Sequence, residues 1–130
     1  MPAKLVLTIL AVDDLERAMV FYSNAFGWTR TVVTPAYAEY AMSDGMRFGL
    51  YERRGFAQNV GQLPARAPEG GVTATELYFY VDDMASAEIR LRHAGARELS
   101  PRAIRSWGDE AVYFADLDGN VIVLADRCRA

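Results

Sequence analysis

The sequence is short of the side chains that most often bind metals or form cross-links. Its 130 residues include one cysteine, Cys128, and one histidine, His93. A single cysteine forms no internal disulfide, so nothing in the sequence requires an oxidising compartment. His93 precedes Ala94-Gly95, at the predicted end of a helix, where a basic ring can meet the free backbone carbonyls. We expect neither Cys128 nor His93 to carry chemistry.

Long apolar runs and a surplus of basic residues are also missing. No hydrophobic segment approaches the roughly 20 residues that a membrane span needs. The opening stretch MPAKLVLTILAVDD is typical of a β-strand and lacks a small-residue cleavage site. The formal net charge of −3 provides no broad basic surface for phosphate groups. We therefore expect a cytoplasmic protein that binds neither membranes nor nucleic acid.

The composition that remains is that of an ordinary globular protein. Hydrophobic residues make up 52% of the chain and charged residues 24%. A chain of 130 residues is long enough to bury a core but short for two full-sized domains. The sequence therefore predicts one domain over residues 1–130.

Within that domain the sequence repeats itself. The segment LTILAVDDLERAMVFYSNAFGW, residues 7–28, aligns with ELYFYVDDMASAEIRLRHAGAR, residues 76–97. The alignment superimposes the two Val-Asp-Asp triplets at 12–14 and 81–83. Self-similarity of this kind indicates two copies of one supersecondary unit.

Each copy begins with a predicted strand and a predicted helix. Residues 4–12 and 73–81 are rich in β-branched, leucine and aromatic side chains, which favour strands. Asp13 and Asp82 are then placed to cap the first free N–H groups of a helix. Glu16, three residues after Asp13, fits the reciprocal position of a capping box.

Gly27 and Gly95 follow the two apolar helical patterns and are predicted to end the helices. The remaining strands are separated by turn residues, and we predict them at residues 29–34, 37–42 and 46–52 in the first copy and 97–99, 111–116 and 120–126 in the second.

The segment between the copies has a different composition. RRGFAQNVGQLPARAPEGG contains two prolines and four glycines. Such a composition favours irregular structure. We therefore predict modules at about 1–52 and 73–130, joined by a connector or flap at 53–72.

The order of these elements resembles the vicinal oxygen chelate superfamily, which includes glyoxalase I, extradiol dioxygenases and bleomycin-resistance proteins. The resemblance rests on VDDLERAMVFYSNAFGW, VDDMASAEIRLRHAGA and SWGDEAVYFADLDGNVIVL, the last with Leu117 where the family usually has proline. It implies an α+β fold of two tandem βαβββ units whose mixed sheets curve round a concave cup. It also implies a homodimer.

Metal-dependent members of that superfamily bind a divalent cation with one His or Glu from each of four strands. The resemblance carries these four positions to Leu7, Gly49 (Leu50 if the register is shifted by one), Glu76 and Val123. Of these residues only Glu76 can coordinate a metal. We therefore expect no metal and no cofactor.

Strand alternation predicts which side chains line the cup, because residues two apart share a face. Leu5, Val121 and Ala125 fall on that face by parity, and Trp107 is placed to close the rim. The residues predicted to contact a ligand are Leu7, Ile9, Tyr51, Glu76, Tyr78, Tyr80, Trp107 and Val123. Such a set suits an apolar or aromatic small molecule. The alternative is that the tyrosines belong to a core or a dimer interface.

Three functions remain open from the sequence. The first is a metal-free protein that binds a small molecule. The second is a glyoxalase-like lyase or isomerase, or a dioxygenase, in which Glu76 belongs to an unrecognised metal set or acts as a general acid or base. The third is a domain that serves only in assembly. Glu76 also has a structural interpretation, in which it hydrogen-bonds a tyrosine or pairs with Arg47.

Overall fold

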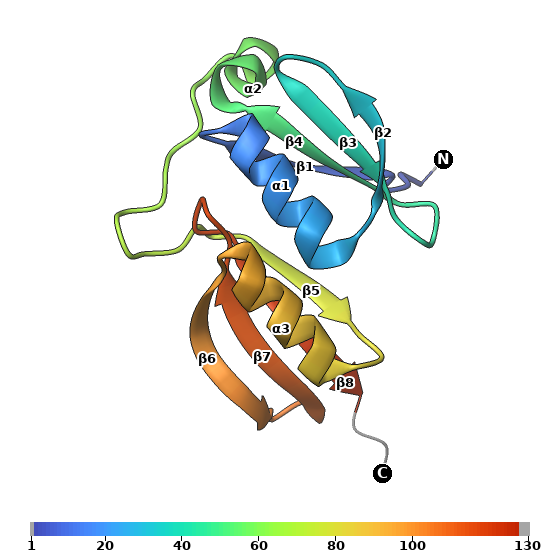
Figure 1. The fold of residues 1–130 in the computed structure, drawn as a ribbon. Helices are drawn as coiled ribbons and strands as arrows, with labels where there is room; N and C mark the ends of the chain where they lie inside the picture. Colours follow the sequence, from blue (N-terminus) through green and yellow to red (C-terminus); the bar gives the residue numbers. More distant parts are fainter. Residues whose placement is uncertain (1, 128–130) are drawn as a thin grey trace. The chain divides into compact units, whose positions relative to one another are not determined.

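The computed structural model describes residues 2–127, and Cys128 lies outside them. The first half consists of strand β1 (Leu7–Val12), helix α1 (Leu15–Phe26), strands β2 (Thr29–Val33), β3 (Tyr37–Ala41) and β4 (Arg47–Glu52), and helix α2 (Arg53–Val60) (Figure 1). The second half consists of strand β5 (Glu76–Tyr80), helix α3 (Met84–Ala94), and strands β6 (Arg97–Ile104), β7 (Asp109–Ala115) and β8 (Val121–Arg127). None of these helices has the length and hydrophobicity to cross a bilayer.

The strands form two four-stranded mixed sheets, ordered β1-β4-β3-β2 and β5-β8-β7-β6. The β1–β4 and β5–β8 pairs are parallel, and the other pairs are antiparallel. The chain divides between Ala65 and Arg66 into two compact units, with residues 24–26 counted in the second. The predicted α+β fold of two tandem βαβββ units is confirmed.

The helix starts differ by one residue from the prediction. The caps are Asp14, which accepts a hydrogen bond from the backbone N–H of Arg17, and Asp83, which accepts one from Ser86. Asp13 and Asp82 were therefore the wrong choices. The predicted capping box fails because Glu16 is only two residues after Asp14. Asp13 instead accepts a hydrogen bond from Arg53 at 2.7 Å.

The ends of both helices follow the prediction. Gly27 and Gly95 adopt left-handed backbone conformations, with φ of 66° and 107°. A residue without a β-carbon enters this region at little cost, and its N–H then meets a free carbonyl of the last turn.

The predicted irregular connector is wrong over its first eight residues, which form α2. The Glu52 carboxylate caps this helix by accepting from the N–H of Arg54 at 2.9 Å, and Gly61 ends it with φ of 87°. Arg53 is buried, and it donates to Asp13 and to the carbonyl oxygen of Pro64 at 2.8 Å. The composition of the segment did not reveal these contacts, because they are made by residues distant in sequence. Residues 61–72 contain neither helix nor strand, as predicted.

Several strand limits also differ from the prediction. The first strand begins at Leu7 rather than residue 4, because Leu7 is the first residue opposite β4. β5 is likewise shorter than the predicted 73–81. β6 is longer than 97–99 and extends to Ile104, since two irregularities in its register with β7 accommodate Pro101.

Each unit has its own core between a helix and a sheet. In the first, Tyr22 of α1 packs against Phe48 of β4, with ring centroids 4.8 Å apart. The buried Tyr40 hydroxyl lies 3.0 Å from Ser23 Oγ and donates to the carbonyl oxygen of Met19. In the second unit the largest fully buried side chains on the α3 side of the sheet, contributed by α3, β7 and β8, are those of Leu91, Val112, Phe114, Ile122 and Leu124.

The hairpin DLDGN fixes the register of β7 and β8. Asp116 Oδ1 accepts from the backbone N–H groups of Asp118 and Asn120, at 2.9 and 2.8 Å. Asn120 Nδ2 donates to Asp116 Oδ2, and Gly119 supplies the positive φ of 85°. The turn places Ala115 opposite Val121. A slip of one residue would move every β8 side chain to the opposite face.

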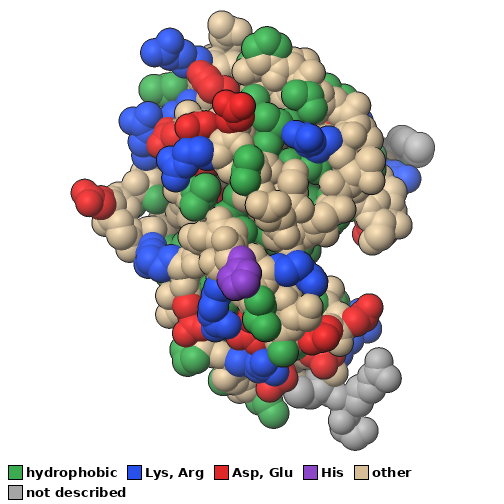
Figure 2. All heavy atoms as spheres, in the orientation of Figure 1, with side chains coloured by type: hydrophobic (Ala, Val, Ile, Leu, Met, Phe, Trp, Pro, Cys, Tyr) green, Lys and Arg blue, Asp and Glu red, His purple; other side chains and the backbone are tan. Residues whose placement is uncertain are grey.

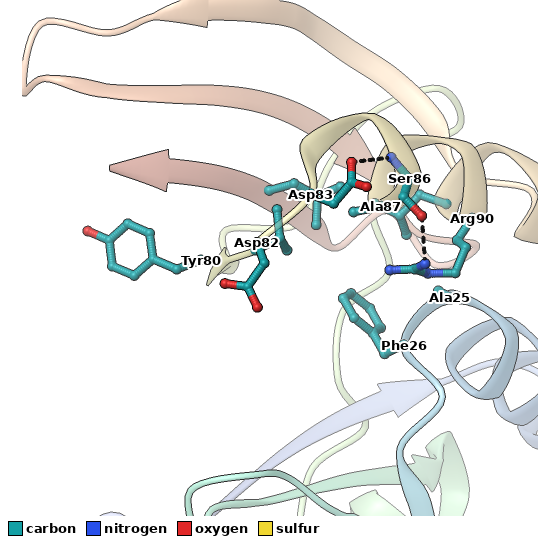
Figure 3. A pocket seen from close by; sticks show the side chains of 11 residues that line it. Ala25, Phe26, Tyr80, Asp82, Asp83, Ser86, Ala87 and Arg90 are labelled. Carbon is teal, nitrogen blue, oxygen red and sulfur yellow. Dashed lines mark hydrogen bonds between the residues drawn. The ribbon is translucent and has the colours of Figure 1, made fainter. Parts of the chain in front are cut away.

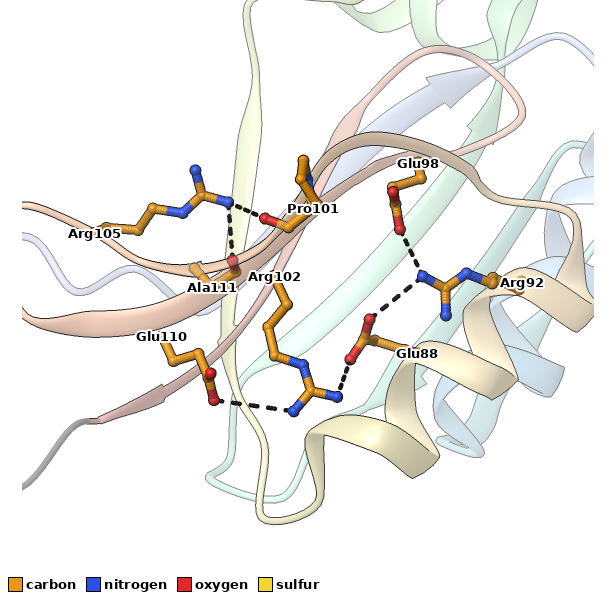
Figure 4. Close-up of polar contacts among 8 residues, drawn as sticks. All are labelled: Glu88, Arg92, Glu98, Pro101, Arg102, Arg105, Glu110 and Ala111. Carbon is orange, nitrogen blue, oxygen red and sulfur yellow. Dashed lines mark hydrogen bonds and ion pairs between the residues drawn. The ribbon is translucent and has the colours of Figure 1, made fainter.

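A buried carboxylate, Glu88, joins α3 to strand β6 of the second sheet (Figure 4). It lies 2.8 Å from a nitrogen of Arg102 on β6 and 3.4 Å from one of Arg92. Arg92 also pairs with Glu98 at 2.5 Å. Because both arginines balance the buried charge, this network is a structural link between helix and sheet.

Candidate functional site

The second sheet presents alternating side chains along β5, as the sequence predicts. Leu77 and Phe79 point to the α3 side, whereas Glu76, Tyr78 and Tyr80 point to the opposite face. We call the latter the second face; the β8 residues opposite these three are Val121, Val123 and Ala125. Tyr78 is 36% exposed and Tyr80 54%, while Val123 is fully buried. Accessible rings thus stand beside a buried apolar floor.

Trp107 lies against this face and is fixed by hydrogen bonds. Its Nε1 donates to the Tyr78 hydroxyl at 2.9 Å, and that hydroxyl donates to Asp109 Oδ2 at 2.7 Å. Burial and the bond to Asp109 raise the pKa of Tyr78 above its ordinary value, so the phenol keeps its proton. The prediction that Trp107 lies at the rim agrees with this contact. Asp109 was missed, because the only sequence signal for it was its place two residues after Trp107.

Two aromatic rings of the second face are covered by arginine side chains. The Arg105 guanidinium lies 4.9 Å from the ring centre of Tyr113, and that of Arg127 lies 4.4 Å from the ring centre of Tyr80. Arg105 is anchored by hydrogen bonds to Ser100 Oγ and to the carbonyl oxygens of Pro101 and Ala111. These rings therefore already accept cations on their faces.

Glu76 lies at the start of β5 and is exposed. Among the described residues it makes neither a hydrogen bond nor an ion pair, and the expected alternative partner, Arg47, pairs with Glu39 instead. The charge of the Glu76 carboxylate nevertheless acts on Tyr113 of strand β7. Burial, and after it the Glu76 carboxylate, raise the pKa of Tyr113, against the opposing effect of Arg105. Glu76 is thus a carboxylate available for an external partner.

The first sheet has a face of different character on the side opposite α1. This first face carries Leu7, Ile9, Tyr37, Glu39, Arg47, Gly49 and Tyr51. The Tyr37 hydroxyl donates to Glu39 at 2.7 Å, and Arg47 pairs with the same carboxylate at 3.1 Å. Burial, followed by the bond to Glu39, raises the pKa of Tyr37 well above its ordinary value. The Tyr51 ring packs beside that of Tyr37 at a tilt of 49°, with ring centroids 4.8 Å apart.

Tyr37 also covers the position of Gly49. A β-carbon added to Gly49 would lie 2.5 Å from the Tyr37 hydroxyl oxygen and 3.0 Å from Ile9 Cγ1. The first face is therefore filled by its own side chains at this point. The sequence reasoning placed Tyr51 on this face but missed Tyr37 and Glu39, because a tyrosine and an acid two residues apart on a strand carry no specific motif.

The four positions implied by the family resemblance do not form a metal-binding set. Leu7 and Val123 are apolar, and Gly49 has no side chain and lies beneath Tyr37. Only Glu76 offers oxygen donors. Within residues 2–127, no three His, Cys, Asp or Glu side chains are grouped so that they could hold a metal ion. The donors present therefore do not fit a divalent metal centre.

Two hollows lie at the helix starts, and the first of them is also bordered by Tyr80 of the second face. One, of about 330 Å³, lies at the start of α3, where Asp83 caps the helix and Ser86 Oγ accepts from Arg90 (Figure 3). The other, of about 510 Å³, borders the start of α1 and includes the helix caps Asp14 and Glu52. These polar groups already serve the fold. His93 is exposed near the end of α3, as expected, and the histidine is visible on the surface among mixed charges (Figure 2).

Comparisons with known proteins agree with this architecture. A crystal structure of a glyoxalase-related enzyme from Fulvimarina pelagi has a TM-score of 0.84 and 24% identity, covering 95% of this chain and 88% of that one. A glyoxalase/bleomycin resistance protein/dioxygenase from Nocardioides has a TM-score of 0.81 and 22% identity, covering 100% and 87%. A lactoylglutathione lyase from Agrobacterium tumefaciens has a TM-score of 0.70 and 21% identity, covering 97% and 95%.

At these identities the solved structures show a common fold and no more. No curated protein sequence matches the chain. The sequence model of the Glyoxalase/Bleomycin resistance protein/Dioxygenase superfamily, however, matches residues 4–124, nearly the whole chain. The chain therefore belongs to the glyoxalase/bleomycin resistance protein/dioxygenase superfamily.

Proposed function

We propose that this protein is a metal-free small-molecule-binding member of its superfamily and that it holds an apolar or aromatic ligand on the second face. One observation carries the proposal: Tyr78, Tyr80 and Trp107 remain accessible on one face, above the buried Val123. Val123 stands at the position of a metal ligand in metal-dependent members of the superfamily. Val123 then supports the rings from below rather than touching the ligand itself.

The hydrogen bonds of the second face support this proposal. Tyr78 and Trp107 are held by each other and by Asp109 before any ligand arrives. Fixing two large rings in advance reduces the side-chain entropy that binding would otherwise cost. Aromatic rings also provide a large contact area with few rotatable bonds. Leu7, Ile9 and Tyr51 belong to the first face, and their contact with a ligand stays a prediction.

A neutral fluorescent probe, N-phenyl-1-naphthylamine, tests this function. We expect its fluorescence to rise on binding. Trp107→Ala and Tyr80→Ala should each weaken binding several-fold, because one aromatic ring contact is worth about 1 kcal/mol. Leu63→Ala is the matched control, since Leu63 is 60% exposed but lies in the irregular segment after α2. Equal binding by all variants, or no binding by the wild type, would contradict the proposal.

Glu76 keeps the enzyme alternative open, because its carboxylate is exposed beside two tyrosines and has no partner among residues 2–127. Elemental analysis of protein purified without chelator separates the two functions. The binding proposal predicts a substoichiometric metal content in the wild type. One divalent metal per chain, lost in Glu76→Gln, would favour the enzyme.

We also propose that the protein is a homodimer. Every residue of the edge strand β2 is exposed, and Val33 is 57% exposed. An uncovered strand edge with apolar side chains is suited to pairing with a second copy across a two-fold axis. Light scattering at micromolar concentration should give twice the 14.4 kDa chain mass. A monomer mass would remove this part of the proposal.

A further inference from the structure

Glu76 places a negative charge at one end of the second face. Glu76 and Tyr80 stand at opposite ends of β5, about 13 Å apart for four steps of a strand. The carboxylate of Glu76 makes no hydrogen bond or ion pair with the described residues. Asp109, the other acid of this face, is buried and accepts a hydrogen bond from the Tyr78 hydroxyl. The start of β5 therefore presents one uncompensated negative charge next to aromatic surface.

The basic groups near this face are engaged or lie at its other end. Arg105 donates to two carbonyl oxygens and to Ser100 Oγ. Arg97 donates to the carbonyl oxygen of Gly71. Arg127 stacks on Tyr80, at the end of β5 remote from Glu76. None of these arginines lies within ion-pair distance of Glu76.

The ring faces themselves show which charge they accept. Both Tyr80 and Tyr113 carry a guanidinium group at less than 5 Å from the ring centre. Aromatic faces attract cations because of their negative quadrupole. Tyr78 stands between Glu76 and Tyr80 on β5, whereas Trp107 lies near Asp109, at the end of the sheet remote from Glu76. No guanidinium is stacked on Tyr78 or Trp107 among the described residues.

We propose that the second face selects an organic cation: a ligand whose ammonium group pairs with Glu76 while its aromatic or apolar body lies on Tyr78. This inference rests on the proposed binding function and narrows it to a class of ligand. The carboxylate supplies a charge-assisted hydrogen bond, and the ring supplies both contact area and attraction for the positive charge. A neutral ligand receives only the contact area.

Three naphthalene probes of nearly equal size test the inference: 1-naphthylmethylamine, which is cationic at pH 7, neutral 1-naphthalenemethanol, and anionic 1-naphthoate. Titration calorimetry should show the amine binding roughly tenfold more tightly than the alcohol, as one charge-assisted contact allows, and the naphthoate binding least. Raising the salt concentration should weaken binding of the amine and leave binding of the alcohol unchanged.

Glu76→Gln should reduce amine binding to the level of the alcohol and change alcohol binding by less than about twofold. Glu110→Gln is the matched control, because Glu110 neighbours Asp109 on β7 and alternates to the opposite side of the same sheet, where Arg102 lies 4.0 Å away. This control should bind all three probes like the wild type. Circular dichroism melting checks that both variants fold.

Each other outcome overturns the inference in a recognisable way. Equal binding of amine and alcohol refutes the charge selection but leaves the binding function standing. Tighter binding of naphthoate means that the arginines determine the choice. Stoichiometric Mn²⁺ or Zn²⁺ binding that Glu76→Gln abolishes makes a metal the occupant. A dimer that dissociates in Trp107→Ala makes a second copy the occupant, and the absence of binding by every probe refutes the proposed function as well.

Discussion

The two sheets start from the same repeat, but their faces differ in how their polar groups are satisfied. Ile9 and Tyr78 are equivalent positions in the alignment, and their partners across the parallel pair are Gly49 and Val123. On the first face a buried acid, Glu39, is held by a tyrosine and an arginine. On the second face the acid at the start of the strand, Glu76, is left to solvent.

The difference separates a structural use of polar residues from a use in recognition. A buried carboxylate must be hydrogen-bonded and paired by its own protein, because desolvating it alone is costly. An exposed carboxylate contributes little to folding and remains available for a partner. Glu39 therefore serves folding and Glu76 is available for recognition, although both stand on the helix-free side of a strand in equivalent units.

The largest expected effect concerns the close contact on the first face. Gly49→Val should lower the free energy of unfolding by about 1–3 kcal/mol or more, because the added atoms collide with Tyr37 and Ile9. Urea denaturation measures the loss. Adding Tyr37→Ala should recover part of it by opening space. If Gly49→Val is as stable as the wild type, Tyr37 does not fill this face in solution.

The same substitution at the two glutamates gives the sharpest form of the comparison. Glu39→Gln should cost about 1–2 kcal/mol of stability, because it breaks a part-buried ion pair and weakens the acceptor of the Tyr37 proton. Glu76→Gln should change stability by less than about 0.5 kcal/mol, as exposed substitutions generally do. Equal losses in urea denaturation would mean that Glu76 has a structural partner in solution.

The sequence predicted what depends on local pattern and on the repeat. The alignment of residues 7–28 with 76–97 correctly gave the two units, their helix ends and the alternation along β5. Alternation also placed Tyr51 on the helix-free side of its sheet. These successes share a cause, since strand parity and helix ends are properties of neighbouring residues.

What the sequence did not reveal depends on contacts between distant residues. Helix α2 was missed because Arg53 is held by Asp13, forty residues earlier in the chain. The cap of α1 was misplaced by one residue, since that same contact engages Asp13 and Asp14 takes the cap. The Tyr37–Glu39–Arg47 group was missed because Arg47 reaches Glu39 from the neighbouring strand β4, and a tyrosine and an acid two residues apart on β3 carry no specific motif.

The pH dependence of stability should also distinguish the faces. Tyr37 has a raised pKa in the folded protein, so between about pH 10 and that higher value the folded state keeps a proton that the unfolded state loses. Stability should therefore be full below pH 10 and fall as the pH rises above it.

Tyr37→Phe should make this alkaline loss shallower, and Tyr78→Phe should have a smaller effect, since Tyr78 is more exposed. Urea denaturation between pH 8 and 11, with phenolate absorbance at 295 nm, measures both. A wild-type stability that stays constant or rises above pH 10 would show that Tyr37 is not held as a neutral donor to Glu39.

The smallest expected effect is that of divalent ions, for which the prediction is no change. A ligand that binds only the folded state raises its stability by an amount set by the ratio of ligand concentration to the dissociation constant. Because Glu76 alone offers donors at the implied metal positions, Mg²⁺, Mn²⁺ or Zn²⁺ should not shift the melting temperature, and chelator should not lower it. Glu76→Gln, measured alongside, should respond in the same way. A chelator could instead lower the melting temperature of the wild type by several degrees and leave that of Glu76→Gln unchanged. This result would show that Glu76 binds a metal together with donors outside residues 2–127 or from a second chain. The second face would then be a site for a metal-held ligand.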